Sequence, residues 1–322
     1  MVAEYSVSPD GEKFHLPGPD DYEKESKRLE KIVSDQRALG REIVVVMGVG
    51  FVGAAMAAVV ADTENENGES TKFVIGMQRP STRSYWKIPL LNRGMAPVKS
   101  EDEELEPMIA RCVNEKKTLT ATFSYEVLKL ADVVVSDVQC DYLKESFGNV
   151  RDGQTDMVAL ENSLEIVAEH IPPETLVLIE TTVAPGTTEQ VAYPIMRKVF
   201  RKRGIQSDPL LAHSFERVMP GKEYVASIRD FWRVCSGINE EATRRVEKFL
   251  GEVINTKDYQ LTVLDRPIES ETAKIVENSF RATILAFLDE WSVFAERNGV
   301  DLIKVIEAIK VRPTHNNIIF PG

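Results

Sequence analysis

The sequence has few of the residues that build disulfide frameworks, metal centres or nucleic-acid surfaces. Its three cysteines, Cys112, Cys140 and Cys235, are far apart and odd in number, and its four histidines show no ligand spacing. This usage excludes a disulfide framework, predicts no metal site and indicates the reducing cytoplasm. Basic residues are also scarce, since the net charge is −12 and the pI about 5.0. A nucleic-acid-binding protein normally carries a basic face, so we exclude that class.

Long uncharged runs are rare too. The longest is residues 43–61, which by length alone would suit a membrane span. Its internal order does not, because a mostly β-branched run, three glycines and an alanine-rich stretch follow one another. This order is typical of a buried strand, a tight turn and a buried helix. A long charged stretch precedes the run, which argues against a signal peptide. We therefore expect no membrane partner.

From residue 41 the chain alternates short apolar strands with helices. Such alternation predicts an α/β fold, a Rossmann-type doubly wound parallel sheet covered on both faces. The expected strands are 43–47, 73–77, 133–138, 175–180 and 210–213, and the expected helices are 51–61, 105–114, 156–170, 188–203 and 240–250. Before them we expect an irregular start at 1–18 and a surface helix at 20–39 that Gly40 ends. Residues 141–155 are expected to form a flexible loop at the margin of the site.

Near residue 266 the character of the chain changes. Residues 268–298 contain no glycine or proline and carry apolar side chains on most sides, which predicts a long helix that is too apolar all round to lie on a surface. Gly299 ends this helix, and Asp301 caps a second one at 302–310. We therefore expect an N-terminal extension (1–40), a Rossmann-like domain (41–266) and an all-α central domain (267–322). The apolar faces of the long helix predict a homodimer through it.

The strongest motif is GVGFVG, which follows the first expected strand and opens a helix. Gly48 permits the tight turn, Gly50 lets the backbone approach a pyrophosphate, and Gly53 lets helix and strand pack closely. Phe51 and Val52 complete the loop. In this position the glycine pattern predicts a dinucleotide cofactor rather than a purely structural turn.

The acidic half of that fingerprint is missing. An acidic residue is expected at the end of the second strand, where it binds the adenosine ribose hydroxyls. This chain has Gln78 there, followed by Arg79. Gln78 can hydrogen-bond a hydroxyl without a charge, and Arg79 can attract a 2′-phosphate. The alternative is that both residues are the polar end of a strand.

Five motifs in a fixed order carry a resemblance. They are GVGFVG at 48–53, ADVVV at 131–135, ETTVAPGTTE at 180–189, SFERVMPG at 214–221 and ETAKIVENSFRA at 271–282. With this ordered set the sequence resembles the UDP-glucose/GDP-mannose dehydrogenase family, the nucleotide-sugar 6-dehydrogenases, from residue 43 to residue 322. The resemblance implies oxidation of the C6 alcohol of a nucleotide sugar through an aldehyde to a carboxylate, using two NAD⁺ and a cysteine thioester. It implies NAD as cofactor, a UDP-sugar as substrate and a role in polysaccharide precursor synthesis.

The resemblance also assigns residues. By motif, the family's active-site threonine, its glutamate of thioester hydrolysis, and its lysine and asparagine match Thr182, Glu216, Lys274 and Asn278. Substrate contacts are expected from the same segments, from Glu216, Arg217, Val218, Lys274 and Asn278. The ERV-x-PG form of the second segment is closer to the branch that acts on UDP-N-acetylhexosamines and their uronic acids.

The chemistry of these residues has a bland alternative in each case. Lys274 and Asn278 share one helix face, and a fixed cation beside an amide would stabilise the negative charge that hydride loss builds on oxygen. The alternative is that the lysine, near the start of its helix, extends its amine into solvent. Without the resemblance, the residues favour this alternative over the catalytic role. Glu216 follows an expected strand, where a carboxylate can accept a proton from water attacking an acyl group. Its alternative is a salt bridge with Arg217.

Two departures from the family pattern are visible. Where the family has Val-Pro-Thr, this chain has Val138, Gln139 and Cys140, which changes an expected nucleotide contact. In the family a Pro-Gly stretch leads into a glycine-rich loop with the nucleophilic cysteine, and this sequence ends at Gly322. We expect that loop and the third, nucleotide-sugar-binding domain to be absent, so that the chain binds NAD without completing the reaction. Cys140 and Cys235 are better explained as small buried hydrophobic residues.

Two other functions remain open. A β-hydroxyacid dehydrogenase of the 6-phosphogluconate type shares the fold and the Lys-x-x-x-Asn pattern, but uses no cysteine and oxidises its substrate once. The SFERVMPG segment argues against it. The second alternative is a dinucleotide-binding module without enzymatic activity.

Overall fold

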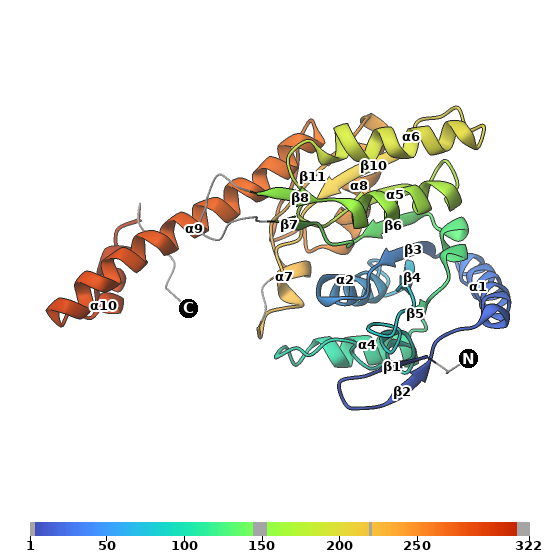
Figure 1. Ribbon diagram of the computed structural model, residues 1–322, viewed down its shortest axis with the longest axis horizontal. Helices are drawn as coiled ribbons and strands as arrows, with labels where there is room; N and C mark the ends of the chain where they lie inside the picture. The colour runs from blue at the N-terminus through green and yellow to red at the C-terminus, as the bar shows by residue number, and fades with distance from the viewer. Residues whose placement is uncertain (1–3, 144–152, 219–220, 314–322) are drawn as a thin grey trace. The chain divides into compact units, whose positions relative to one another are not determined.

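An eight-stranded sheet lies at the centre of the first of two structural units (Figure 1). The computed structural model describes residues 4–143, 153–218 and 221–313, and the two units are residues 1–271 and 272–322. The strand order is β12-β11-β10-β9-β6-β3-β4-β5, and neighbouring strands are parallel except β10 and β11. The strands are β3 (Glu42–Met47), β4 (Lys72–Met77), β5 (Leu119–Thr122), β6 (Val133–Ser136), β9 (Leu176–Ile179), β10 (Leu210–Ser214), β11 (Arg233–Gly237) and β12 (Leu261–Val263).

Helices follow most of these strands and cover both faces of the sheet. They are α1 (Pro19–Ala38), α2 (Phe51–Asp62), α3 (Lys87–Asn92), α4 (Leu105–Asn114), η1 (Tyr125–Leu130), α5 (Val158–His170), η2 (Thr188–Ala192), α6 (Tyr193–Lys202), α7 (Ala226–Arg229) and α8 (Glu240–Val253). The predicted doubly wound α/β fold is therefore confirmed.

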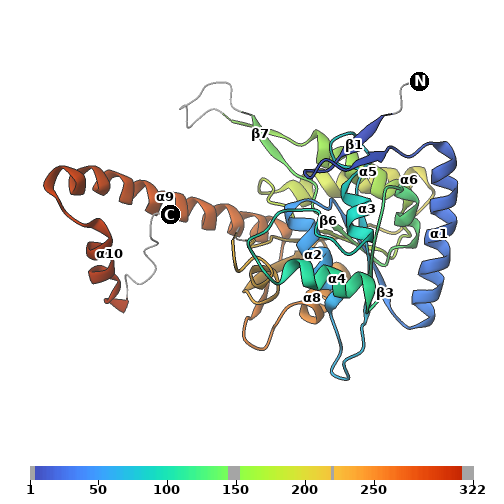
Figure 2. The ribbon, with the colours of Figure 1, turned by 90° about the horizontal axis from the view of Figure 1, so that it is seen from below.

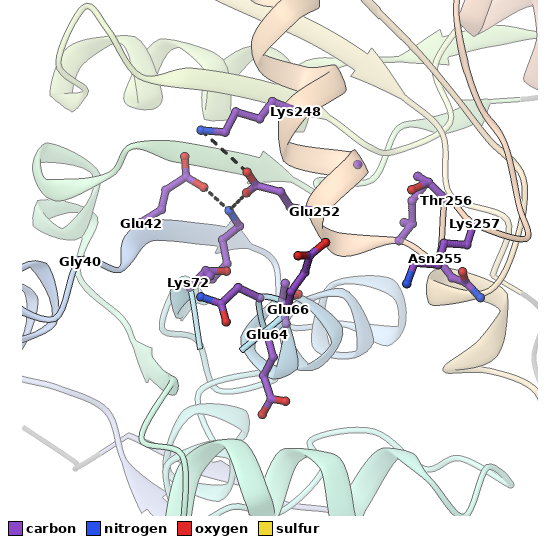
Figure 3. Close-up of a pocket in the computed structure, with 15 residues that line it drawn as sticks. Gly40, Glu42, Glu64, Glu66, Lys72, Lys248, Glu252, Asn255, Thr256 and Lys257 are labelled. Atoms are coloured by element: carbon purple, nitrogen blue, oxygen red, sulfur yellow. Dashed lines mark hydrogen bonds and ion pairs between the residues drawn. The ribbon is translucent and has the colours of Figure 1, made fainter. Parts of the chain in front are cut away.

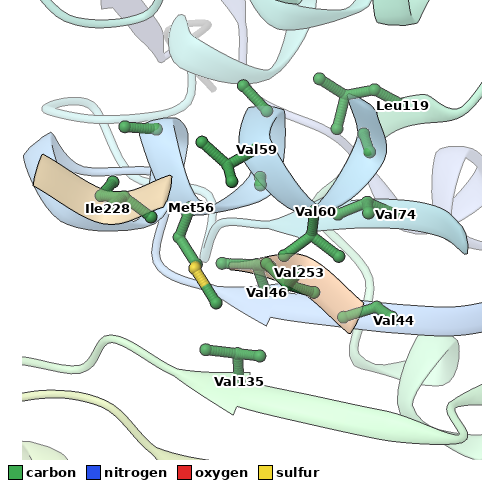
Figure 4. Packing of buried hydrophobic residues seen from close by; sticks show 14 of the residues in the cluster. Val44, Val46, Met56, Val59, Val60, Val74, Leu119, Val135, Ile228 and Val253 are labelled. Carbon is green, nitrogen blue, oxygen red and sulfur yellow. The ribbon is translucent and has the colours of Figure 1, made fainter. Parts of the chain in front are cut away.

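The two faces are built by strict alternation along the strands. On β3, Val44 and Val46 join the apolar cluster formed with α2, α4 and α8, which Figure 4 shows around Met56 and Val60. Their neighbours Ile43 and Val45 join a second cluster with α1, α5 and α6. Because both faces are buried, these strands read as continuous apolar runs in the sequence, which made them easy to predict.

The short strands were missed or misread. Residues 4–18 are not irregular, because β1 (Tyr5–Val7) and β2 (Lys13–His15) pair as an antiparallel hairpin. The Ser6 hydroxyl accepts a hydrogen bond from the Trp86 backbone, which places this hairpin beside α3 (Figure 2). The margin loop begins and ends as paired strands, β7 (Asp141–Leu143) and β8 (Gln154–Asp156), and its residues 144–152 lie outside the described residues.

Three strands of the main sheet were also not predicted, namely β5, β11 and β12. Unlike the predicted strands β6 and β9, which are almost wholly apolar, these strands carry polar residues (LTAT, RVCSG and LTV), so no continuous apolar run reveals them. The helix expected at 188–203 begins with a π-helical turn, η2, and continues as α6.

The second unit contains the larger part of α9 (Pro267–Asn298) together with α10 (Leu302–Lys310). Both helices were predicted with these bounds or within one residue of them. Asp301 caps α10, since its carboxylate accepts from the backbone N–H groups of Ile303 and Lys304. Gly299 has a φ of +65°, the left-handed conformation expected where a helix ends. Among the described residues, no helix has both the length and the apolar character that a membrane span requires.

Candidate functional site

The glycine loop between β3 and α2 is shaped by close backbone contacts. Gly48 has a φ of +95° and its N–H donates to the Met77 carbonyl at 2.8 Å. A Cβ placed on Gly53 would lie 1.8 Å from the Gly48 carbonyl oxygen, so only glycine fits there. A Cβ placed on Gly50 would meet nothing within 4 Å. Gly50 is therefore free of local steric demand and lies open on the loop, as a backbone that approaches a ligand must be.

Gln78 supports this loop from the neighbouring strand. Its side-chain oxygen accepts from the Val49 backbone N–H at 3.2 Å, and its Nε2 lies 3.4 Å from the Ser84 hydroxyl. The sequence predicted a ribose contact for Gln78 and missed this supporting role, which depends on β3 and β4 being adjacent. Arg79, one residue further, is exposed.

An aromatic pair closes one side of the loop. The exposed Phe51, the first residue of α2, stacks on Tyr224 with ring centroids 4.4 Å apart and planes at 12°. Tyr224 is fully buried, whereas Val52 is half-buried. Sequence reasoning did not single out Tyr224, because no local motif surrounds it and its partner lies far away in the chain.

Charged side chains gather where the strands next to this loop end. Asp137 follows β6, Glu180 follows β9, and Arg233 begins the antiparallel β11, so all three lie at the carboxyl edge of the sheet. Arg233 and Glu180 form an ion pair and are both 0% exposed. Arg233 also donates to the Ser214 hydroxyl at 3.3 Å. This edge is where open α/β sheets bind their ligands.

The pairing within this group is incomplete. Among the described residues, several buried atoms have no hydrogen-bond partner: both carboxyl oxygens of Asp137, Oε2 of Glu180, Nε and Nη1 of Arg233, and the Tyr224 hydroxyl. Burial, with the neighbouring Glu180 and Glu216 carboxylates, raises the pKa of Asp137 well above its ordinary value, although Arg233 acts in the opposite direction. Burial raises the pKa of Glu180 as well, against the effect of Arg233.

The predicted catalytic residues Thr182 and Glu216 lie at this same edge. They follow the adjacent parallel strands β9 and β10 by a few residues, and both are half-buried. The Glu216 carboxylate accepts from the Val218 backbone N–H at 2.6 Å. The guanidinium of Arg217 lies over the rings of Phe215 and Phe231, 5.3 and 5.6 Å from their centroids. Val138, also half-buried, follows Asp137 directly and packs against the core.

Glu271 is a site-supporting residue that sequence reasoning missed. It is fully buried and its two carboxylate oxygens accept from the Gly186 N–H, the Thr188 N–H and the Thr188 hydroxyl at 2.5, 2.7 and 2.7 Å. These bonds fix the turn that follows Thr182. Glu271 is the first residue of the ETAK segment, which was part of the family resemblance, but only the lysine of that segment was assigned a role.

Lys274 and Asn278 belong to the second unit. They lie one helical turn apart on α9, so the predicted shared face is present. Lys274 is half-buried and Asn278 is exposed.

The three cysteines are poor nucleophiles. All are buried, as predicted for Cys140 and Cys235. Burial raises the pKa of Cys112 and Cys235 to about 12 and that of Cys140 above its ordinary value. Because the thiolate is the reactive form, burial makes these thiols weaker nucleophiles than an exposed cysteine.

Known proteins place this geometry in a family. Residues 42–254 match the family model described as UDP-glucose/GDP-mannose dehydrogenase family, NAD binding domain, and residues 268–322 match the central domain of the same family. The chain is 27% identical over 273 residues to UDP-N-acetyl-D-mannosamine dehydrogenase of Pyrococcus horikoshii, covering 84% of this chain and 58% of that protein. It is 26% identical to NDP-N-acetyl-D-galactosaminuronic acid dehydrogenase of Ralstonia nicotianae, covering 86% of this chain and 60% of that one.

A solved structure of a dehydrogenase is also similar to this chain. The crystal structure of NDP-N-acetyl-D-galactosaminuronic acid dehydrogenase from Methanosarcina mazei Go1 matches with a TM-score of 0.69 and 28% identity, covering 91% of this chain and 59% of that chain. The chain thus spans somewhat less than two thirds of the length of these relatives. It belongs to the UDP-glucose/GDP-mannose dehydrogenase family, and its first unit contains the NAD binding domain of that family.

Proposed function

We propose that this chain is part of an NAD-dependent nucleotide-sugar 6-dehydrogenase that oxidises the C6 alcohol of a UDP-N-acetylhexosamine to the uronic acid, in polysaccharide precursor synthesis. The observation that carries the proposal is the match of both family domains, in order, to a chain whose glycine loop has the shape that a dinucleotide needs. The names of its N-acetylhexosamine relatives support the choice of substrate.

The residues present fit NAD. Gly50 is the N-cap of α2, and no described side chain caps the first turn of that helix, so its N–H groups can hold the pyrophosphate. Phe51 offers an exposed ring beside them. When bound, NAD supplies the hydride acceptor. Thr182 and Glu216, which follow strands at the same edge of the sheet, are the residues of this unit proposed to contact the sugar.

The remaining roles are charge stabilisation and proton transfer. Lys274 stabilises the negative charge that develops on the C6 oxygen, with Asn278 one turn away orienting it. Glu216 accepts a proton from the water that releases the acid. Formation of the acid also needs a thiol nucleophile, and Cys112, Cys140 and Cys235 are all buried. We therefore propose that the 322 residues bind NAD but do not release two NADH per sugar.

A NADH-formation assay with UDP-N-acetylmannosamine, UDP-N-acetylglucosamine and UDP-glucose tests this function. The present chain is compared with the same chain joined to the cysteine loop and third domain of a relative. We expect NADH only from the joined protein, with the acetylated sugars preferred, and a fall of about 100-fold or more in Lys274→Ala. Two NADH per sugar from the present chain would mean that the assignment of Cys140 and Cys235 is wrong.

The choice between NAD and NADP is tested separately. Gln78 is neutral and already bonded to the loop, and the exposed Arg79 could attract a 2′-phosphate, so the choice of NAD rests on the match to the family's NAD binding domain. Calorimetric titration of both cofactors should show tighter binding of NAD. Arg79→Ala should leave the NAD affinity unchanged. Tighter NADP binding that Arg79→Ala abolishes would reverse this assignment.

We also propose that a second copy of this chain covers the apolar face of α9. Phe287, Trp291 and Phe294 form a row of edge-to-face rings and are 58%, 48% and 53% exposed. Three exposed aromatic side chains in one row are more than a monomer surface usually shows. Light scattering at micromolar concentration should give a dimer, and Trp291→Glu a monomer. Glu290→Lys, a charge change at the adjacent exposed position, is the control that should remain dimeric.

A further inference from the structure

Asp137 lies directly beneath the glycine loop. It is the first residue after β6, and its backbone N–H donates to the carbonyl of Met47, the last residue of β3. A Cβ placed on Gly53 would lie 3.0 Å from Oδ2 of Asp137, and one placed on Gly48 would lie 3.3 Å from the Asp137 carbonyl oxygen. The carboxyl group therefore lies against the loop from which α2 begins.

In the part of the chain that the structure describes, no cation forms an ion pair with Asp137. Both of its carboxyl oxygens are buried and without a partner among the described residues. The groups that act on it are the Glu180 and Glu216 carboxylates, the Tyr224 hydroxyl and the Arg233 guanidinium. Arg233 is already paired with Glu180. Asp137 and Glu180 thus share one guanidinium, and an ionised Asp137 would be a buried charge without an ion-pair partner of its own.

We propose that Asp137 is a positioning residue which remains a neutral carboxylic acid beneath the dinucleotide loop, and that NAD binds to this protonated form. The inference rests on the proposed cofactor site. The pyrophosphate is negatively charged and is held by the positive end of α2. An ionised carboxylate behind the same loop would repel that charge, whereas a carboxylic acid would not. The raised pKa of Asp137 agrees in direction with this assignment.

Binding of NAD and protonation of Asp137 are coupled. NAD adds negative charge next to Asp137, so binding favours the protonated carboxyl, and at a pH where free protein has begun to lose this proton the complex takes one up. The dissociation constant for NAD then rises as the pH rises, at most tenfold per pH unit for a single proton. A neutral residue at this position removes the dependence.

The test is calorimetric titration of NAD into the 322-residue chain from about pH 6 to about pH 9, a range within which a raised carboxyl pKa can fall. Wild type is compared with Asp137→Asn, which is neutral and of the same shape, and with Asp208→Asn, an exposed aspartate before β10. We expect the dissociation constant to rise with pH in wild type and Asp208→Asn, by tenfold or more across the range, and to stay flat in Asp137→Asn. Equal profiles in wild type and Asp137→Asn would overturn the inference.

A second measurement needs no variant. Titration of wild type at the alkaline end in two buffers of different ionisation enthalpy gives the number of protons exchanged on binding. Net uptake supports the inference, whereas no uptake or net release contradicts it. Should Asp137→Asn not fold, Asp137→Ala, which is smaller and also neutral, takes its place. Failure of wild type to bind NAD at any pH would instead refute the proposed function itself.

Discussion

The two edges of the main sheet bury charge in opposite ways. At the amino edge, Lys72 begins β4 with its side chain only 3% exposed, yet it is paired with Glu42 at 2.8 Å and with Glu252 of α8 (Figure 3). Lys248 lies 3.8 Å from Glu252 and adds a fourth charge. At the carboxyl edge, Glu180 and Arg233 are fully buried, as are the carboxyl oxygens of Asp137, but all three side chains retain unpaired atoms in the described part of the chain.

The two edges differ in whether their buried charged groups have a full set of partners. A buried charge with a full set of partners belongs to the architecture, and Lys72 ties β3, β4 and α8 together in this way. Buried polar atoms left without partners destabilise the folded chain unless water, an ion or a ligand satisfies them. They occur here on the side where the glycine loop opens, which is where a ligand arrives. The incomplete pairing therefore supports the proposed ligand site at the carboxyl edge.

The largest effect should come from breaking the buried ion pair between Arg233 and Glu180 at the carboxyl edge. Arg233→Met leaves the buried Glu180 carboxylate without its ion-pair partner, so the unfolding free energy of the first unit should fall by about 3–5 kcal/mol. Urea denaturation measures this. Arg244→Met removes an arginine from an exposed pair with Glu241 and should leave the unfolding midpoint unchanged. A small effect of Arg233→Met would mean that water already satisfies this cluster.

A methyl group in the glycine loop should have the next largest effect. Gly53→Ala forces a Cβ against the Gly48 carbonyl, and such overpacking costs about 1–3 kcal/mol and displaces the loop. Gly50→Ala meets no atom of the protein, so its thermal stability should equal that of wild type while its NAD affinity falls about tenfold. Differential scanning calorimetry and cofactor titration separate the two. If Gly50→Ala binds NAD normally, the pyrophosphate does not approach Gly50.

Lys72→Met should give the smallest loss, about 1–2 kcal/mol, since Glu42 and Glu252 are each about one third exposed and remain hydrated. Burial by itself lowers the pKa of Lys72, but the two glutamates raise it above its ordinary value overall. The stabilisation is therefore complete below the ordinary lysine pKa and is lost as the pH rises through the raised one. Unfolding curves of wild type and Lys72→Met should differ at neutral pH and converge in alkali. A constant difference would assign the effect to packing.

The sequence alone determined what repeats locally or stands as a contiguous motif. The period of apolar residues predicted α10 at its observed bounds and α9 within one residue, because every turn of a helix repeats the signal. The GVGFVG motif located the cofactor loop, since the demand for glycine at Gly48 and Gly53 arises within a single turn of chain. The ordered motifs indicated the family that the comparisons show.

Only the tertiary structure decided which charges share a site. Asp137, Glu180 and Arg233 come from three separate strands, and they meet because β6, β9, β10 and β11 lie in this order in the sheet. The support of the loop by Gln78, the stacking of Tyr224 on Phe51 and the bonds from Glu271 to Gly186 and Thr188 also join distant segments. No local pattern encodes such pairs. Burial and strand order together determine whether a charged residue is a surface charge, a structural ion pair or part of a site.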